Sequence, residues 1–193
     1  MGVSIRDAEV TNGGKLVGGD DNSVHIKTET HNHPATQTKL SVLFDSLKRK
    51  FEQEEQTDCI SEELKFYQTD RDTIGLEQKL KDGDLEYLFE DASLLKEAYA
   101  RKLYRYQLYE PAQEIHTYIL GIICNKFRWL IYPLIKKSTP QEEIARLISS
   151  DIIDPIMKII MEQGCNDIMG LTYRDIEGMI YFLTGRCHIK WKL

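Results

Sequence analysis

The stretch AQEIHTYILGIICNKFRWLIY, residues 112–132, is the most apolar segment of the 193-residue chain and decides its fold. Its large apolar side chains recur every three or four positions, the spacing that places them on one face of a helix. They are Ile115, Tyr118, Ile119, Ile122, Ile123, Phe127 and Leu130. Pro111 precedes the stretch and suits the first turn of a helix, where its missing N–H leaves no hydrogen bond unmade. We therefore expect a central helix against which other helices pack.

The same apolar spacing continues upstream of this stretch as far as residue 38. The upstream helices that it predicts span residues 38–56, 60–67, 76–83 and 84–106. Gly83 is expected to close the third of these helices, because glycine tolerates the backbone of a helix C-terminus. Asp84 is expected to cap the fourth helix.

Downstream, two prolines mark where helices begin. Thr139 and Glu142 form a capping box, with Pro140 at the first helical position of the helix that follows. A row of isoleucines between residues 148 and 160 continues the helical pattern. Pro155 lies within this row, and proline cannot donate the hydrogen bond that a helix interior needs. We expect either a break before Pro155 or a helix that starts just ahead of it.

The last predicted helix follows a second capping arrangement, made by Thr172 and Asp175, and Gly185 is expected to terminate it. Residues 186–191 follow as a short extended tail. The fold class is therefore all-α: an irregular multi-helix bundle with a short extended C-terminal tail and a glycine-rich N-terminal leader, either flexible or β-forming.

The leader differs in character from the rest of the chain. Three of the five histidines and both Gly-Gly pairs lie before residue 36, and helical periodicity begins only after it. We therefore predict two parts, a glycine-rich leader or linker over 1–36 and a helical interaction domain over 37–193.

Composition excludes several classes of protein. The formal charge of -6 and the pI near 5.4 argue against a surface built wholly for nucleic acid. Four cysteines far apart, without CxxC spacing or a signal peptide, predict reduced and mostly buried thiols. No apolar run approaches the ~18 residues of a membrane span. We expect a soluble, cytoplasmic protein that makes no membrane contact.

The leader contains one possible metal site, in the sequence Glu29-Thr30-His31-Asn32-His33. In an extended segment, Glu29, His31 and His33 would point the same way and could bind a metal ion in a metal-dependent enzyme. An exposed polar linker explains the same residues, and no HExxH or CxxC completes a ligand set. We therefore expect no metal and no other cofactor.

The glycine pairs of the leader do not form a phosphate loop, because Lys15 precedes the second pair and no helix follows. Short β-arcs are an alternative, since arcs that stack from chain to chain can drive assembly. The residues that would form them are Val17, Gly18, Gly19, Asp20 and Asn22. This alternative predicts a self-assembling signalling module and a possible homo-oligomer.

No catalytic set is apparent in the helical part. His116 lies one position off the predicted buried face and is expected to be a satisfied polar group. Cys187 and His188 are adjacent, so on a strand they would point to opposite faces and could not act as nucleophile and base. We therefore expect no enzyme activity and no catalytic residue.

Several segments resemble proteins of the bacterial three-component ABC-ATPase conflict systems, which include Lamassu-type antiphage defence. The C-terminal signature is GMIYFLTGRCHIKW, residues 178–191. Upstream likenesses lie at 74–80, 110–116, 132–135 and 152–156, with a leader likeness at 12–20.

The resemblance implies a helical C-terminal domain that docks onto an SMC-like or RecF-like ABC ATPase and a small middle component. It also implies that the chain meets DNA only indirectly, through the complex. Effector chains of this group commonly carry a toxic enzyme ahead of the docking domain, and residues 1–36 are too short for one. We therefore expect an adaptor or regulator.

The tail supports two interpretations. Tryptophan and arginine often anchor interfaces, so Arg186, His188, Lys190 and Trp191 are candidate partner-binding residues. Alternatively, Ile189 and Trp191 pack back on the helices and hold the terminus in place, with Cys187 inside. The sequence leaves both open.

Overall fold

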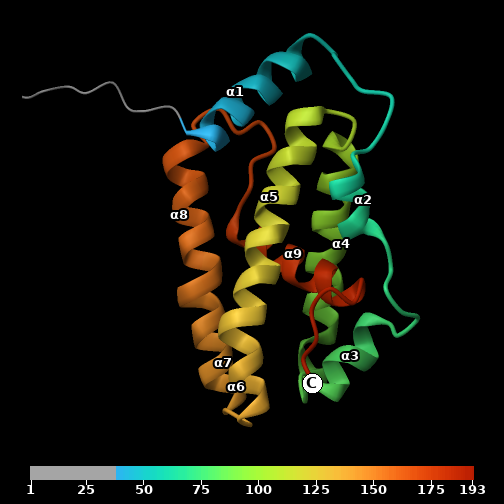
Figure 1. Cartoon of the computed structure of the whole chain (residues 1–193), viewed down its shortest axis with the longest axis vertical. Coiled ribbons are helices and arrows are strands. Elements are labelled where there is room, and N and C mark those ends of the chain that lie inside the picture. The colour runs from blue at the N-terminus through green and yellow to red at the C-terminus, as the bar shows by residue number, and fades with distance from the viewer. Residues whose placement is uncertain (1–37) are drawn as a thin grey trace, which may run out of the picture. The chain divides into compact units, whose positions relative to one another are not determined.

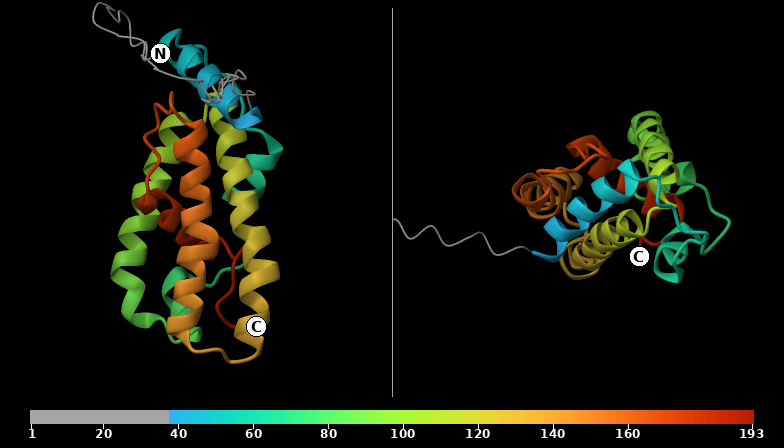
Figure 2. Two further views of the ribbon diagram at one scale, coloured as in Figure 1. Left: turned by 90° about the vertical axis from the view of Figure 1, so that its left-hand side faces the viewer. Right: turned by 90° about the horizontal axis from the view of Figure 1, so that it is seen from above.

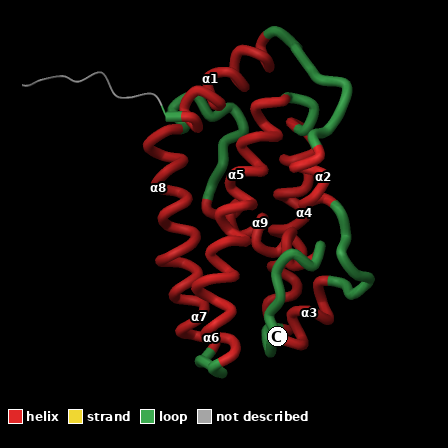
Figure 3. Tube along the Cα trace, viewed as in Figure 1, coloured by secondary structure: helices red, strands yellow, loops and turns green. Residues whose placement is uncertain are grey.

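The computed structural model describes residues 38–193. Within this range every regular element is helical, and Figure 3 shows no strand in it. The leader assembly residues Val17, Gly18, Gly19, Asp20 and Asn22, together with Glu29, His31 and His33, lie outside the described residues, so their roles stay predictions, as does the boundary at residue 36.

Long helices run side by side along the domain, and α1 crosses one end of them (Figures 1 and 2). The α-helices are α1 Lys39–Glu52, α2 Glu62–Gln68, α3 Leu76–Asp82, α4 Phe89–Tyr106, α5 Glu110–Lys126, α6 Tyr132–Lys136, α7 Gln141–Leu147, α8 Asp154–Gln163 and α9 Tyr173–Gly185. Three shorter turns interrupt them: η1 Glu86–Leu88, of 3₁₀ type, and η2 Phe127–Ile131 and η3 Ile148–Ile153, of π type. The all-α fold class is thereby confirmed.

Helix α5 forms the predicted core helix and shares the centre with α9. Ile115, Ile119 and Ile123 of α5 are almost fully buried, as the periodicity requires, but Tyr118 and Leu130 of the predicted face are exposed. Helix α9 packs chiefly on α4, and a Cβ at Gly178 would lie 2.5 Å from the carbonyl oxygen of Leu95. Because no side chain fits there, Gly178 allows the two helices to approach closely.

The predicted capping box of α9 is confirmed. Thr172 accepts from the backbone of Asp175, and the Asp175 carboxylate accepts from the Thr172 N–H at 2.8 Å. Asp175 is buried and also accepts from Lys102 Nζ of α4 at 2.8 Å. One carboxylate therefore caps α9 and ties it to α4.

Both π turns lie directly before a proline. Turn η2 precedes Pro133 in the second position of α6, and η3 precedes Pro155 in the second position of α8. Proline lacks an N–H and its ring crowds the carbonyl four residues earlier, so a wider turn relieves both problems without ending the helix. The predicted start just ahead of Pro155 is confirmed, and the chain stays helical through it.

Four helices end in a Schellman turn at a residue other than glycine. These residues, all with φ between 54° and 59°, are Glu54, Asp84, Ser138 and Cys187. In each turn the following N–H bonds to the carbonyl five residues earlier, as Leu85 does to Leu80 at 2.8 Å. The prediction that Asp84 caps the next helix is therefore wrong, because Asp84 completes the end of α3.

Three other predictions about helix ends need correction. Pro140 is the N-cap of α7 and not its first helical residue, since its extended backbone (ψ 139°) lies outside the helix. No side chain caps this end of α7, so the predicted capping box of Thr139 and Glu142 is wrong. Gly185 remains inside α9, and Cys187 makes the turn instead. Beyond this turn the tail has no helix or strand.

The continuous helix Glu110–Lys136 corrects the expectation about membrane-spanning length. It has 27 residues and a mean hydropathy of 1.2 in its most apolar window, so by length and composition alone it could cross a membrane. The core helix of a soluble protein meets the same criteria. Here the α5 part of this helix packs against α1, α2, α4 and α9.

Candidate functional site

The C-terminal tail closes back on the domain through Trp191. Its side chain is 7% exposed, its ring meets Phe127 edge to face at 5.4 Å, and its Nε1–H donates to Thr184 Oγ1 at 3.1 Å. A Cβ on Gly83 would lie 2.5 Å from Trp191 Cβ, so Gly83 allows the tail to pass close to the end of α3. Ile189 is fully buried. The structure therefore supports the terminal clasp.

The other predicted partner-binding residues lie beside this clasp and differ in exposure. Arg186 bonds Asp70 at 2.9 Å, and Lys190 is exposed, with its backbone N–H donating to Tyr132. His188 packs against the rings of both Phe66 and Tyr67, which also contact each other. Partner binding by Arg186, His188, Lys190 and Trp191 stays a prediction.

Burial shifts the pKa of two titratable groups near the tail. Burial, with Arg71 nearby, lowers the pKa of His188 to about 4. Burial, together with a hydrogen bond to Asp72, raises the pKa of the Cys187 thiol. A thiol with a raised pKa forms little of the nucleophilic thiolate at neutral pH.

His116 is fully buried, which corrects the expectation that it lies off the buried face. Its Nδ1 and the Tyr99 hydroxyl are 3.3 Å apart, but its Nε2 has no hydrogen-bond partner among the described residues. Burial, and then the positive charge of Lys102, lower the pKa of His116 to about 4. At neutral pH His116 is therefore an uncharged core residue, only half satisfied.

The cysteines also differ from the expectation of mostly buried thiols. All four are free as predicted, but Cys59 and Cys165 are exposed and only Cys187 is buried. The sequence could not show this, because Cys59 and Cys165 lie in connections between helices, where exposure depends on how the chain turns.

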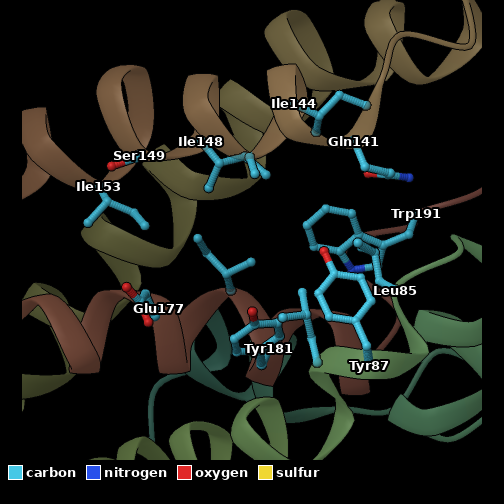
Figure 4. A pocket seen from close by; sticks show the side chains of 13 residues that line it. Leu85, Tyr87, Gln141, Ile144, Ile148, Ser149, Ile153, Glu177, Tyr181 and Trp191 are labelled. Carbon is cyan, nitrogen blue, oxygen red and sulfur yellow. The ribbon is translucent and has the colours of Figure 1, made fainter.

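The site most suited to a ligand is an apolar groove between the α7–η3 segment and α9 (Figure 4). Its volume is about 250 Å³. Ile144 and Ile148 form one wall, and Ile180 and Tyr181 form the other. Helices α7 and α9 are both needed to make it, so the groove exists only in the folded domain.

The two ends of the groove differ chemically. Trp191 and Gln141 close one end, where Gln141 Nε2 donates to the Gly83 carbonyl at 2.7 Å. Glu177 and Ser149 lie toward the other end, as Figure 4 shows. Trp191 thus links the tail to the groove, because the same ring that closes the terminus also closes the groove.

Sequence reasoning did not identify this groove. The apolar periodicity predicts only that Ile148 belongs to a helix, and it gives no role to Tyr87 or Glu177. Pairing Tyr87 with α7 and α9 required the tertiary arrangement.

A model of one protein family matches residues 75–191, more than half of the chain. The family is described as C-terminal domain 9 of the ABC-three component (ABC-3C) systems. The matched range contains every residue of the groove and the whole clasp. No curated protein and no solved structure matches the chain.

Proposed function

The chain belongs to the family of C-terminal domain 9 of the ABC-three component systems, and from this premise we propose that it is a non-catalytic interaction subunit of such a system. It acts as an adaptor or regulator that docks onto an SMC-like ABC ATPase and its small partner component. Family membership implies association with the other components.

The observation that carries this proposal is the open apolar groove beside η1, α7 and α9. Tyr87, which lines the groove, is 76% exposed. A large apolar side chain exposed at the edge of an apolar groove is typical of interaction sites. A domain that buries Trp191 and the isoleucines of α9 yet leaves this surface open is suited to receive a partner.

The chemistry of the described residues favours binding over catalysis. His116 and His188 are neutral well below pH 7, and the pKa of the Cys187 thiol is raised by burial. An efficient catalytic base or nucleophile needs a pKa near the working pH or an activating neighbour. The shifts of these three groups lead away from neutral pH, which supports a structural role for them.

The test is co-expression with an ABC ATPase and a small component of a three-component system from the same organism. We expect the three to co-purify. Ser149→Arg places a long cation in the groove from an exposed position and should break the association, whereas Ser150→Arg, its exposed neighbour outside the groove lining, should not. Co-purification that Ser149→Arg leaves unchanged would exclude the groove as the docking surface.

We further propose that the complex acts in the cytoplasm in defence against phage or plasmids, with DNA contacted through the ATPase. Cells carrying the three genes should plate phage less efficiently than cells in which this chain bears Ser149→Arg. Equal plating of a panel of phages on both strains would contradict a defence role while leaving the docking result intact.

A further inference from the structure

The walls of the groove suit side chains presented by another helix. Its volume of about 250 Å³ is at the small end of the range for small-molecule pockets, about 300–1,000 Å³. Both walls are helical, and Ile144 and Ile148 on one wall are four residues apart. A wall with this spacing matches the i, i+4 ridge of another helix lying along it. An amphipathic helix that inserts two apolar side chains therefore fits the space.

The end of the groove at Glu177 has a carboxylate that makes no salt bridge among the described residues, with Arg174 one helical turn before it. Neither Glu177 nor Asp91 has a cation within ion-pair distance among residues 38–193, although both lie close to Tyr181. Burial, and then the negative charge of Glu177, raise the pKa of Tyr181 to about 12, so its hydroxyl keeps its proton. A positively charged side chain of a bound partner could therefore pair with the carboxylates of Glu177 and Asp91, neither of which forms a salt bridge with a lysine or arginine among residues 38–193.

The exposed rim continues this pattern beyond the groove. Tyr87, Asp91 and Leu94 follow one another at spacings of four and three residues, which places the carboxylate between two exposed apolar side chains. A partner segment that covers this rim would need apolar side chains on both sides of a positively charged one. A chain with many acidic residues would be repelled there.

We propose that the groove binds a basic amphipathic helix of another component of the system, with two apolar residues seated beside Ile148 and a lysine or arginine facing Glu177 and Asp91. This inference rests on the proposed function, since it names the chemistry of the partner at the same surface.

The first experiment tests whether the negative charge of Glu177 contributes to binding of the partner. Glu177→Lys, in the complex formed with the co-expressed ATPase and small component, should weaken association by about tenfold or more. Glu63→Lys on α2 makes the same charge change at an exposed residue outside this groove and should leave the affinity unchanged. Urea unfolding of both variants checks that the fold is retained. Raising the salt concentration should weaken the wild-type complex more than the Glu177→Lys complex, because exposed charge pairs are screened.

The second experiment identifies the bound segment. A benzophenone amino acid replaces Tyr87 at the groove edge, and the assembled complex is irradiated and mapped by mass spectrometry. We expect the adduct in a helix of a partner component with apolar residues four apart and a lysine or arginine one turn away. Replacing that lysine or arginine of the partner with glutamate should restore its binding to the Glu177→Lys variant.

The outcomes separate the two proposals. If the components co-purify and Glu177→Lys binds like the wild type, or the adduct maps to an acidic segment or to a second copy of this chain, the inference is wrong and the docking function stands. If the components never associate, both fail.

Discussion

The indole Nε1–H of Trp191 donates to Thr184 Oγ1 at 3.1 Å, in a buried contact between the end of the chain and α9. Thr184 in turn donates to the Ile180 carbonyl at 2.9 Å. The tail is thereby held by both a hydrogen bond and a packed ring. Ile180 and Trp191 also line the groove, so loss of the tail would change the shape of the proposed docking surface.

Trp191→Ala should lower the free energy of unfolding by about 3–5 kcal/mol, because it removes a buried aromatic ring. Trp191→Phe should cost less, about 1–3 kcal/mol, since it mainly removes the hydrogen bond to Thr184. Trp129→Ala is the matched control, because Trp129 is 68% exposed and should change stability by no more than about 0.5 kcal/mol. Urea unfolding followed by far-ultraviolet circular dichroism measures all three. Equal losses for the two alanine variants would contradict the clasp.

Gly178→Ala should destabilise the domain by about 1–3 kcal/mol, because the new Cβ would meet the Leu95 carbonyl oxygen and Tyr99 Cβ and push α4 from α9. Gly121→Ala should be neutral or stabilising by up to about 1 kcal/mol, since alanine favours a helix over glycine. At Gly121 the nearest atom is the Tyr67 hydroxyl oxygen at 3.4 Å, the far end of a side chain. Thermal unfolding of both variants gives the comparison. Both substitutions gain helix propensity, so the difference between their melting temperatures reports the cost of separating α4 from α9.

Ser138→Gly should stabilise the protein by about 0.5–1 kcal/mol, because Ser138 is exposed with a φ of 54° and glycine adopts this backbone without strain. Ser150→Gly inside η3 serves as the control and should destabilise by about 0.5 kcal/mol. Differential scanning calorimetry gives both values. A lower melting temperature for Ser138→Gly would show that the serine contributes something other than strain.

Stability should fall as the pH drops from about 6.5 toward 4, in part because of His116. Its pKa in the folded state is lowered to about 4, chiefly by burial and next by Lys102, while Asp175 acts in the opposite direction. In the unfolded chain His116 takes up a proton near its ordinary pKa of 6.5, so between these values the unfolded state binds more protons and is favoured. The contribution of His116 to stability is therefore fully present above about pH 6.5 and is lost as the pH falls toward 4.

His116→Gln should flatten this dependence by up to about 3 kcal/mol between pH 7 and 4, the free energy of a shift of this size. The slope of unfolding free energy against pH is the quantity to compare, because the variant also loses packing at every pH. His188 titrates in the same direction but is only half-buried, so His188→Gln should change the slope less. A slope that His116→Gln leaves unchanged would mean that His116 is solvated in the native state.

The elements themselves could be predicted because their signals are local. The period of the apolar residues located α5, and the Thr172 and Asp175 pair located the start of α9 to the residue. Helix ends were harder. Gly83 and Gly185 were expected to make the turns, yet Asp84 and Cys187 have the positive φ. Gly83 is required for a different reason, the close passage of Trp191, and no local pattern shows a contact between residues so far apart in the sequence.

The amino-acid sequence alone determined the helical class, the order of the helices and the likeness to three-component systems, because periodicity, caps and motifs depend on neighbours along the chain. Only the tertiary structure decided that Trp191 faces inward, that His116 is fully buried, and that α7 and α9 leave a groove with Glu177 at one end. These features arise where distant segments meet, and the volume between two helices depends on packing that no single segment specifies.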